Sequence, residues 1–112
     1  IIDIARVGWT AQNPVFRQVF TSRFIPEATE AQVHWFNELA RMTTTAEAAG
    51  TLLEARARIN VTALLDQVAA PTLVLHARQD SVVPLEEGRL LAAGIPGARF
   101  VELDSRNHVL LE

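Results

Sequence analysis

Apolar positions along the first 68 residues recur at helical spacing. The pair Asn13-Pro14 is typical of a helix start, because asparagine caps well and proline suits the first helical position. Thr29 and Thr44 are each followed three residues later by Gln or Glu, which is the spacing of a capping box. Asn60 is a further candidate cap, ahead of a short helix through Leu64 and Leu65. The pattern predicts four helices, with apolar stripes at Val15, Phe16, Val19 and Phe20; at Val33, Trp35, Phe36, Leu39, Ala40 and Met42; and at Ala49, Leu52, Leu53 and Ala55.

After these helices the pattern becomes strand-like. Residues 72–77, TLVLHA, form a continuous apolar run after Pro71, which predicts a strand buried on both faces of a parallel sheet. Pro84 then opens a helix with acidic residues in its first turn, and Gly94 with the following Ile-Pro is expected to end it. Residues 98–103 supply a second strand. Because a helix connects the two strands, they are expected to be parallel.

Composition narrows the class of protein. The 112 residues suffice for one domain, and 49% hydrophobic with 21% charged residues is ordinary for a globular chain. No apolar run approaches the roughly 18 residues that a membrane span needs. The net charge is −3 and the basic residues are scattered, which indicates no nucleic-acid contact. Cysteine is absent, which excludes disulfides and thiolate zinc sites within the chain.

Two residues with catalytic potential follow the two predicted strands. Asp80 comes shortly after the first strand and His108 shortly after the second, at the sheet edge where α/β proteins place their sites. Histidine can take a proton from a serine hydroxyl, while a carboxylate on its other ring nitrogen fixes the tautomer. The pair therefore predicts an orienting acid, Asp80, and a general base, His108. No G-x-S-x-G turn occurs in the chain, so the nucleophile is expected before Ile1.

Each of these residues also has a purely structural interpretation. Asp80 is a common type of turn residue and can cap the segment that follows it, and His108 can be a surface histidine. His76 lies inside a strand and is expected to be a satisfied core residue. A metal site of His76, Asp80 and His108 matches no recognised ligand spacing, so no metal is predicted. His34 is expected to be solvated.

The other candidate side chains favour structural roles. The serines at positions 22, 81 and 105 lack the strand, sharp turn and helix of a nucleophile turn and are expected to be turn or cap residues. Five aromatic residues can either pack between helices, the favoured interpretation, or line an acyl pocket: Trp9, Phe16, Phe20, Trp35 and Phe36.

Longer motifs resemble a known family. They are W-x4-P-x-F from Trp9, F-I-P at 24–26, W-F-N-E-L at 35–39, A-P-T-L-V-L-H-A-R-x-D-x-V-V-P at 70–84 and I-P-G-A-R-F-V-x-L-x-S-x-N-H at 95–108. This pattern resembles the C-terminal part of α/β-hydrolase fold proteins. Among these it resembles the domains that occur alone or joined to bacterial adenylate cyclase or LuxR-type regulator modules.

The resemblance implies an α/β fold that is a C-terminal fragment of an α/β hydrolase. Residues 1–68 would form a helical lid, and residues 69–112 the last parallel β-α-β unit of the core. Asp80 would follow the penultimate strand and His108 the last one, in the chain order Ser, Asp, His. The implied function is that of a serine esterase acting on a small hydrophobic ester, with this segment inactive by itself. No cofactor is expected, because no phosphate-cradling glycine loop is present.

Other functions remain open from the sequence. The domain can instead be a small-molecule sensor within a regulator or cyclase, with an idle triad, or purely an interaction domain. Because two strands are few for an open sheet, the isolated chain is expected to form a homo-oligomer that covers its strand faces and edge. Without cysteines or a recognisable signal peptide, the expected location is the cytoplasm.

Overall fold

The computed structural model describes residues 8–9 and 15–111, and these form two compact units. The first unit comprises residues 1–23 and 28–59, and the second comprises residues 24–27 and 60–112. The predicted Asn13-Pro14 helix start lies outside the described residues, as do the side chains of Val15 and Phe16. The division into a lid over 1–68 and a β-α-β unit over 69–112 stays a prediction.

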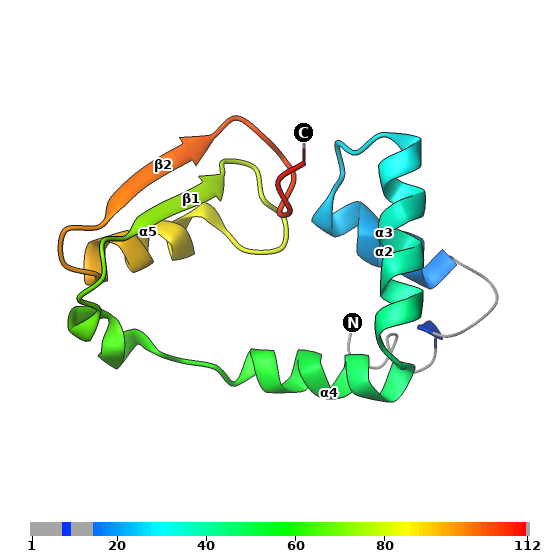
Figure 1. Ribbon diagram of the computed structural model, residues 1–112, viewed down its shortest axis with the longest axis horizontal. Helices are drawn as coiled ribbons and strands as arrows, with labels where there is room; N and C mark the ends of the chain where they lie inside the picture. The colour runs from blue at the N-terminus through cyan, green and yellow to red at the C-terminus, as the bar shows by residue number, and fades with distance from the viewer. Residues whose placement is uncertain (1–7, 10–14, 112) are drawn as a thin grey trace. The chain divides into compact units, whose positions relative to one another are not determined.

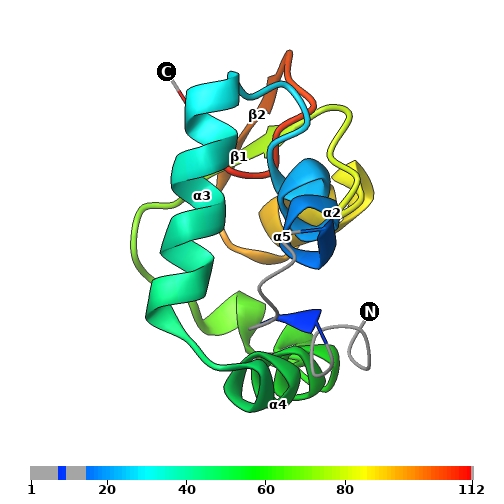
Figure 2. The same ribbon diagram turned by 90° about the vertical axis from the view of Figure 1, so that its right-hand side faces the viewer.

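The first unit is helical. It contains α2 (Val15–Phe24), α3 (Glu30–Thr43) and α4 (Ala46–Ala57), although Phe24, the last residue of α2, belongs to the second unit. Helix α4 runs across the end of α3 (Figures 1 and 2). Trp9 and Ala49 are the buried centre of its apolar cluster, and Phe20 packs edge-on against the Trp9 ring at 4.9 Å between centroids. The Trp9 indole nitrogen donates to the Ala40 carbonyl at 3.1 Å. The tryptophan thus connects three segments through one apolar body and one polar atom.

The Thr29 capping box is confirmed in both directions. The Thr29 hydroxyl accepts from the Gln32 backbone at 3.2 Å, and the Gln32 side chain accepts from the Thr29 backbone at 2.9 Å. The prediction of a second box at Thr44 is wrong by one residue. Thr44 is the extended C-cap of α3, so Thr45 caps α4 instead, by accepting from the Ala48 backbone at 3.2 Å. Alanine at that third position has no hydrogen-bonding side chain to complete a box.

The second unit contains a parallel β-α-β arrangement. After the 3-10 helix η1 (Thr62–Gln67) come β1 (Leu73–Ala77), α5 (Leu85–Gly94) and β2 (Arg99–Leu103). The two strands pair in parallel, with Leu75 opposite Val101, and α5 packs on both (Figure 1). The predicted fold class, helices followed by a parallel β-α-β unit, is confirmed. None of the described helices is long and apolar enough to cross a membrane.

The short helix predicted after Asn60 is η1, which is a 3-10 helix. The Asn60 side chain accepts from the Thr62 backbone at 3.1 Å, although the residue at the N-cap position is Val61. The predicted end of α5 at Gly94-Ile95-Pro96 is confirmed, because Gly94 is the last helical residue and Ile95 is the C-cap. A Cβ at Gly94 would lie 2.7 Å from Leu65 Cδ1, so the glycine lets η1 approach α5 closely.

The sheet has one covered and one open face within the described residues. His76 on β1 and Glu102 on β2 share the face that α5 covers, where His76 meets Gly88 and Glu102 pairs with Arg89. On the other face Leu73 is 53% exposed and Leu75 is 47% exposed. The prediction that β1 is buried on both faces is therefore wrong for this chain, because α5 packs against one face only of these two strands.

Close contact between α5 and β1 requires glycine at position 88. A Cβ added to Gly88 would lie 2.4 Å from His76 Nδ1, so we expect Gly88→Ala to lower the free energy of unfolding by about 1–3 kcal/mol. In a His76→Ala background the imidazole ring that would clash is absent. There Gly88→Ala should instead raise the free energy of unfolding by up to about 1 kcal/mol, because alanine has the higher helix propensity. Urea unfolding followed by circular dichroism measures both. Equal losses in the two backgrounds would contradict the proposed contact.

Candidate functional site

The loops that follow β1 and β2 lie side by side because the strands are parallel neighbours. Beyond the last residue of β1, the Arg78 backbone donates to the Leu103 carbonyl at 2.9 Å, and the Gln79 backbone donates to the Ser105 carbonyl at 3.2 Å. These bonds extend the pairing past the strand ends. They bring the turn that carries Asp80 against the loop that carries His108.

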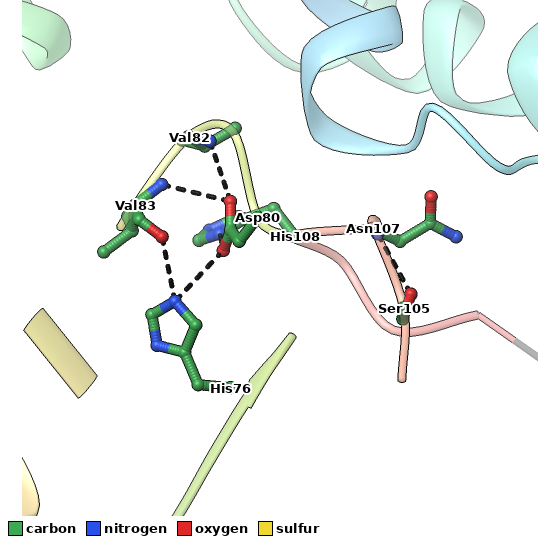
Figure 3. Close-up of polar contacts among 7 residues, drawn as sticks. All are labelled: His76, Asp80, Val82, Val83, Ser105, Asn107 and His108. Atoms are coloured by element: carbon green, nitrogen blue, oxygen red, sulfur yellow. Dashed lines mark hydrogen bonds and ion pairs between the residues drawn. The ribbon is translucent and has the colours of Figure 1, made fainter. Parts of the chain in front are cut away.

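The Asp80 carboxylate is buried and each of its oxygens is engaged. Oδ1 accepts from the backbone of Val82 at 2.7 Å and of Val83 at 3.0 Å. Oδ2 lies 2.7 Å from His108 Nδ1, and the Asp80 side chain is 3% exposed. Figure 3 shows the carboxylate between the 82–83 backbone and the two histidines. The Asp80 side chain therefore caps the turn with one oxygen and contacts His108 with the other.

The hydrogen bonds of Asp80 outweigh the effect of its burial. Burial raises the pKa of this carboxyl, whereas the His108 hydrogen bond and the backbone N–H groups of Val83 and Val82 lower it, and the net pKa is below the ordinary value of 3.8. Asp80 is therefore ionised across the neutral range. An ionised carboxylate accepts hydrogen bonds and donates none.

That charge state decides how the His108 ring is used. Nδ1 must carry the proton it donates to Asp80, which leaves Nε2 of the neutral ring as the nitrogen with a free lone pair. The His108 side chain is 32% exposed, so the ring is accessible at a partly open surface. Chemically, this is an imidazole oriented to accept a proton at Nε2, beside a carboxylate that stabilises the imidazolium.

A segment from far earlier in the chain holds the histidine loop. The Phe24 carbonyl accepts from the backbones of His108 at 2.7 Å and Val109 at 3.2 Å, and the Phe24 ring meets the imidazole edge-on at 5.3 Å between centroids. Asn107 is buried, and its side-chain oxygen accepts from the Glu27 backbone at 2.8 Å. The sequence pattern indicated the F-I-P turn and the N-H pair separately. Nothing in it indicated that they meet.

The loop also has internal support. The Asn107 backbone donates to the Ser105 hydroxyl at 3.0 Å, as Figure 3 shows, and the Arg106 backbone donates to the Glu27 carboxylate at 3.3 Å. Ser105 therefore has the structural role predicted for it. Ser22 is instead a helical residue, whose hydroxyl donates to the Val19 carbonyl at 2.8 Å within α2. Ser81 is exposed in the turn after Asp80.

The remaining candidates belong to the first unit, with one exception. His34 is exposed on α3, and Trp9 with Phe20 packs in the helical core, while Trp35 contacts Phe36 and is half-exposed. The exception is His76, whose Nε2 lies 3.5 Å from Asp80 Oδ2 and 2.8 Å from the Val83 carbonyl. Over residues 8–9 and 15–111, no group of three acidic, histidine or cysteine side chains is arranged to hold a metal ion.

Solved structures of hydrolases share this fold. No protein-family model matches the sequence. Over 96% of its length the chain superposes on an esterase from Exiguobacterium antarcticum (TM-score 0.74, 22% identity) and on a hydrolase from Oleispira antarctica (TM-score 0.75, 16% identity). Over the same share of its length it superposes on a hydrolase from Pseudomonas aeruginosa (TM-score 0.76, 26% identity). The chain has part of an α/β-hydrolase fold. It covers 40%, 39% and 42% of those three chains, about two fifths of a hydrolase.

The likeness supports the coarse prediction, a partial α/β-hydrolase fold related to hydrolases and esterases. It does not extend to the finer ones. The catalytic roles of Asp80 and His108 stay predictions, although the structure places the two side chains in contact. The link to adenylate cyclase or LuxR-type modules and the cytoplasmic location also stay predictions.

The low pKa of Asp80 makes part of the stability depend on pH. Because the folded-state pKa lies below the ordinary 3.8, the ionised carboxylate stabilises the fold above that pH, and this contribution is lost as the pH falls through the folded-state value. We expect Asp80→Asn to lower the free energy of unfolding near pH 7 by about 1.5–3 kcal/mol, the strength of a hydrogen bond to a charged group. The difference from wild type should shrink below about pH 4.

Urea unfolding between pH 3 and pH 7 measures this dependence. The matched control is Asp66→Asn, which removes an exposed carboxylate in η1 and should change stability by no more than about 0.5 kcal/mol at any pH. A loss for Asp80→Asn that is the same at pH 3 and pH 7 would contradict the charge-assisted bond.

Proposed function

We propose that Asp80 and His108 are the acid and the general base of a Ser-His-Asp triad in a serine hydrolase of the esterase type. The observation that supports this most strongly is the 2.7 Å contact between Asp80 Oδ2 and His108 Nδ1 at the carboxyl ends of parallel strands. The similar solved structures include an esterase and two hydrolases. The serine itself is proposed to precede Ile1.

In the proposed reaction, His108 Nε2 takes the proton of the serine hydroxyl as its oxygen attacks the ester carbonyl. Asp80 stabilises the imidazolium that forms, and stays ionised. The imidazolium then returns the proton to the leaving alcohol, and the same base activates water to release the acid. The donors that stabilise the oxyanion are also proposed to lie upstream of this segment.

A small hydrophobic ester is the proposed substrate class. The apolar face of α3 carries Trp35, Leu39 and Met42, all of which are exposed in the described structure. An exposed apolar face of this kind suits an apolar acyl group as its ligand. The proposal needs no metal or organic cofactor, since the serine, the imidazole and the carboxylate supply every proton transfer.

Labelling with a fluorophosphonate, which reacts with activated serines, tests the proposal in the protein that carries this chain together with its upstream sequence. Wild type should be labelled once, and His108→Gln should slow labelling by at least about 10³-fold, because the base is lost. His34→Gln is the matched control, since His34 is an exposed histidine on α3, and it should label like wild type.

The outcomes separate the candidate functions. Absence of labelling in folded wild type would overturn the hydrolase proposal and favour a small-molecule sensor with an idle acid–histidine pair. Labelling that His108→Gln leaves unchanged would show an active serine that does not use this base.

We also propose that the 112-residue chain by itself forms a homo-oligomer. Leu73, Leu75 and Val101 lie exposed on the sheet face opposite α5, and a second copy can cover them. Sedimentation equilibrium at micromolar concentration should show a dimer or larger species, which Leu75→Glu weakens. Leu90→Glu is the control, because Leu90 is exposed on α5 away from this face. A compact wild-type monomer would refute self-association.

A further inference from the structure

A second histidine contacts the candidate acid. His76 is on β1, four residues before Asp80, and its side chain is 10% exposed. Its Nε2 lies 2.8 Å from the Val83 carbonyl and 3.5 Å from Asp80 Oδ2 (Figure 3). The sequence indicated only a satisfied core residue at this position. The structure agrees that the ring is buried and hydrogen-bonded, and it shows in addition that the ring contacts the turn that presents the acid.

The hydrogen bond to Val83 determines the tautomer of His76. A backbone carbonyl only accepts, so the proton must be on Nε2, and Nε2–H donates to Val83. Of the two neighbouring acceptors the carbonyl is the nearer, and the Asp80 oxygen at 3.5 Å lies beyond a normal hydrogen-bond length. His76 therefore acts on the carboxylate mainly through the turn.

Val83 is held at both of its backbone polar groups. Its N–H donates to Asp80 Oδ1 at 3.0 Å, and its carbonyl accepts from His76 at 2.8 Å. The Val83 N–H thus orients the carboxylate, and the Val83 carbonyl is bound to His76 on β1. If the His76 bond is lost, Val83 is held from one side only, and the carboxylate loses part of the support that directs Oδ2 toward His108.

The packing around His76 restricts the position of its ring. Gly88 of α5 faces the ring, and a Cβ there would lie 2.4 Å from Nδ1 and 3.0 Å from Cγ. Only a residue without a side chain lets the helix backbone come this near. The ring is therefore confined between β1 and α5, with Nε2 directed at the turn.

From these contacts we infer that His76 is a positioning residue for Asp80, acting by anchoring the Val83 carbonyl so that the acid keeps its alignment on His108. This rests on the proposed function as far as catalysis is concerned. The anchoring itself is independent of any reaction.

The anchoring is tested in the 112-residue chain by nuclear magnetic resonance, without any activity. In wild type at neutral pH, the ¹⁵N shifts of His76 should show the Nε2–H tautomer. In His76→Asn the donor at the Nε2 position is gone, and the His108 Nδ1 proton should exchange with solvent roughly tenfold faster, as expected when one supporting hydrogen bond is lost. His76→Gln places an amide donor near the Nε2 position and should restore slow exchange.

The catalytic consequence is tested by fluorophosphonate labelling of the protein with its upstream sequence. His76→Asn should slow labelling about 10- to 100-fold, the size of effect that a small misalignment of a catalytic group produces. His76→Gln should label within a few-fold of wild type. His34→Gln again serves as the control on an exposed histidine.

The two measurements separate the two ideas. If folded wild type is not labelled, the hydrolase proposal fails, and the tautomer and exchange data alone decide the role of His76. A wild-type His76 protonated on Nδ1 instead of Nε2 overturns the inference without any variant, including the case where His76→Asn does not fold. Unchanged exchange and labelling in folded His76→Asn would overturn it as well.

Discussion

The parallel pairing of β1 with β2 is the constraint on which the candidate site depends. Parallel strands that are neighbours end at the same edge of their sheet, so residues 28 positions apart in sequence come into contact there. The crossover helix α5 packs on both strands. Backbone bonds beyond the strand ends then continue the pairing into the loops that carry Asp80 and His108.

Backbone groups supply most of the orientation within the site. Asp80 is aligned by two N–H groups of its own turn, and His108 is aligned by the Phe24 carbonyl, which accepts two bonds from the histidine loop. Backbone donors and acceptors do not depend on side-chain identity, so the contacts of such a site are hard to predict from a sequence. The Glu27 backbone N–H, which donates to the Asn107 side chain, gives the histidine loop a further hydrogen bond to residues 24–27.

The acid illustrates how one buried carboxylate can serve structure and chemistry together. Burial alone would favour a neutral Asp80, but three hydrogen-bond donors keep it ionised. Two of them are the backbone bonds that form the turn. The turn therefore maintains the charge that orients the imidazole, and a structural interpretation of Asp80 does not compete with a catalytic one.

The sequence by itself determined the local elements and the two candidate residues. The Thr29 capping box, the helix after Pro84 and the parallel strands all follow from short-range patterns, since caps, dipoles and strand runs depend on neighbours in the chain. Only the tertiary structure decided the contacts of Phe24 and His76, and the exposed sheet face at Leu75. These depend on which surfaces meet, and the spacing of residues along one chain does not encode that.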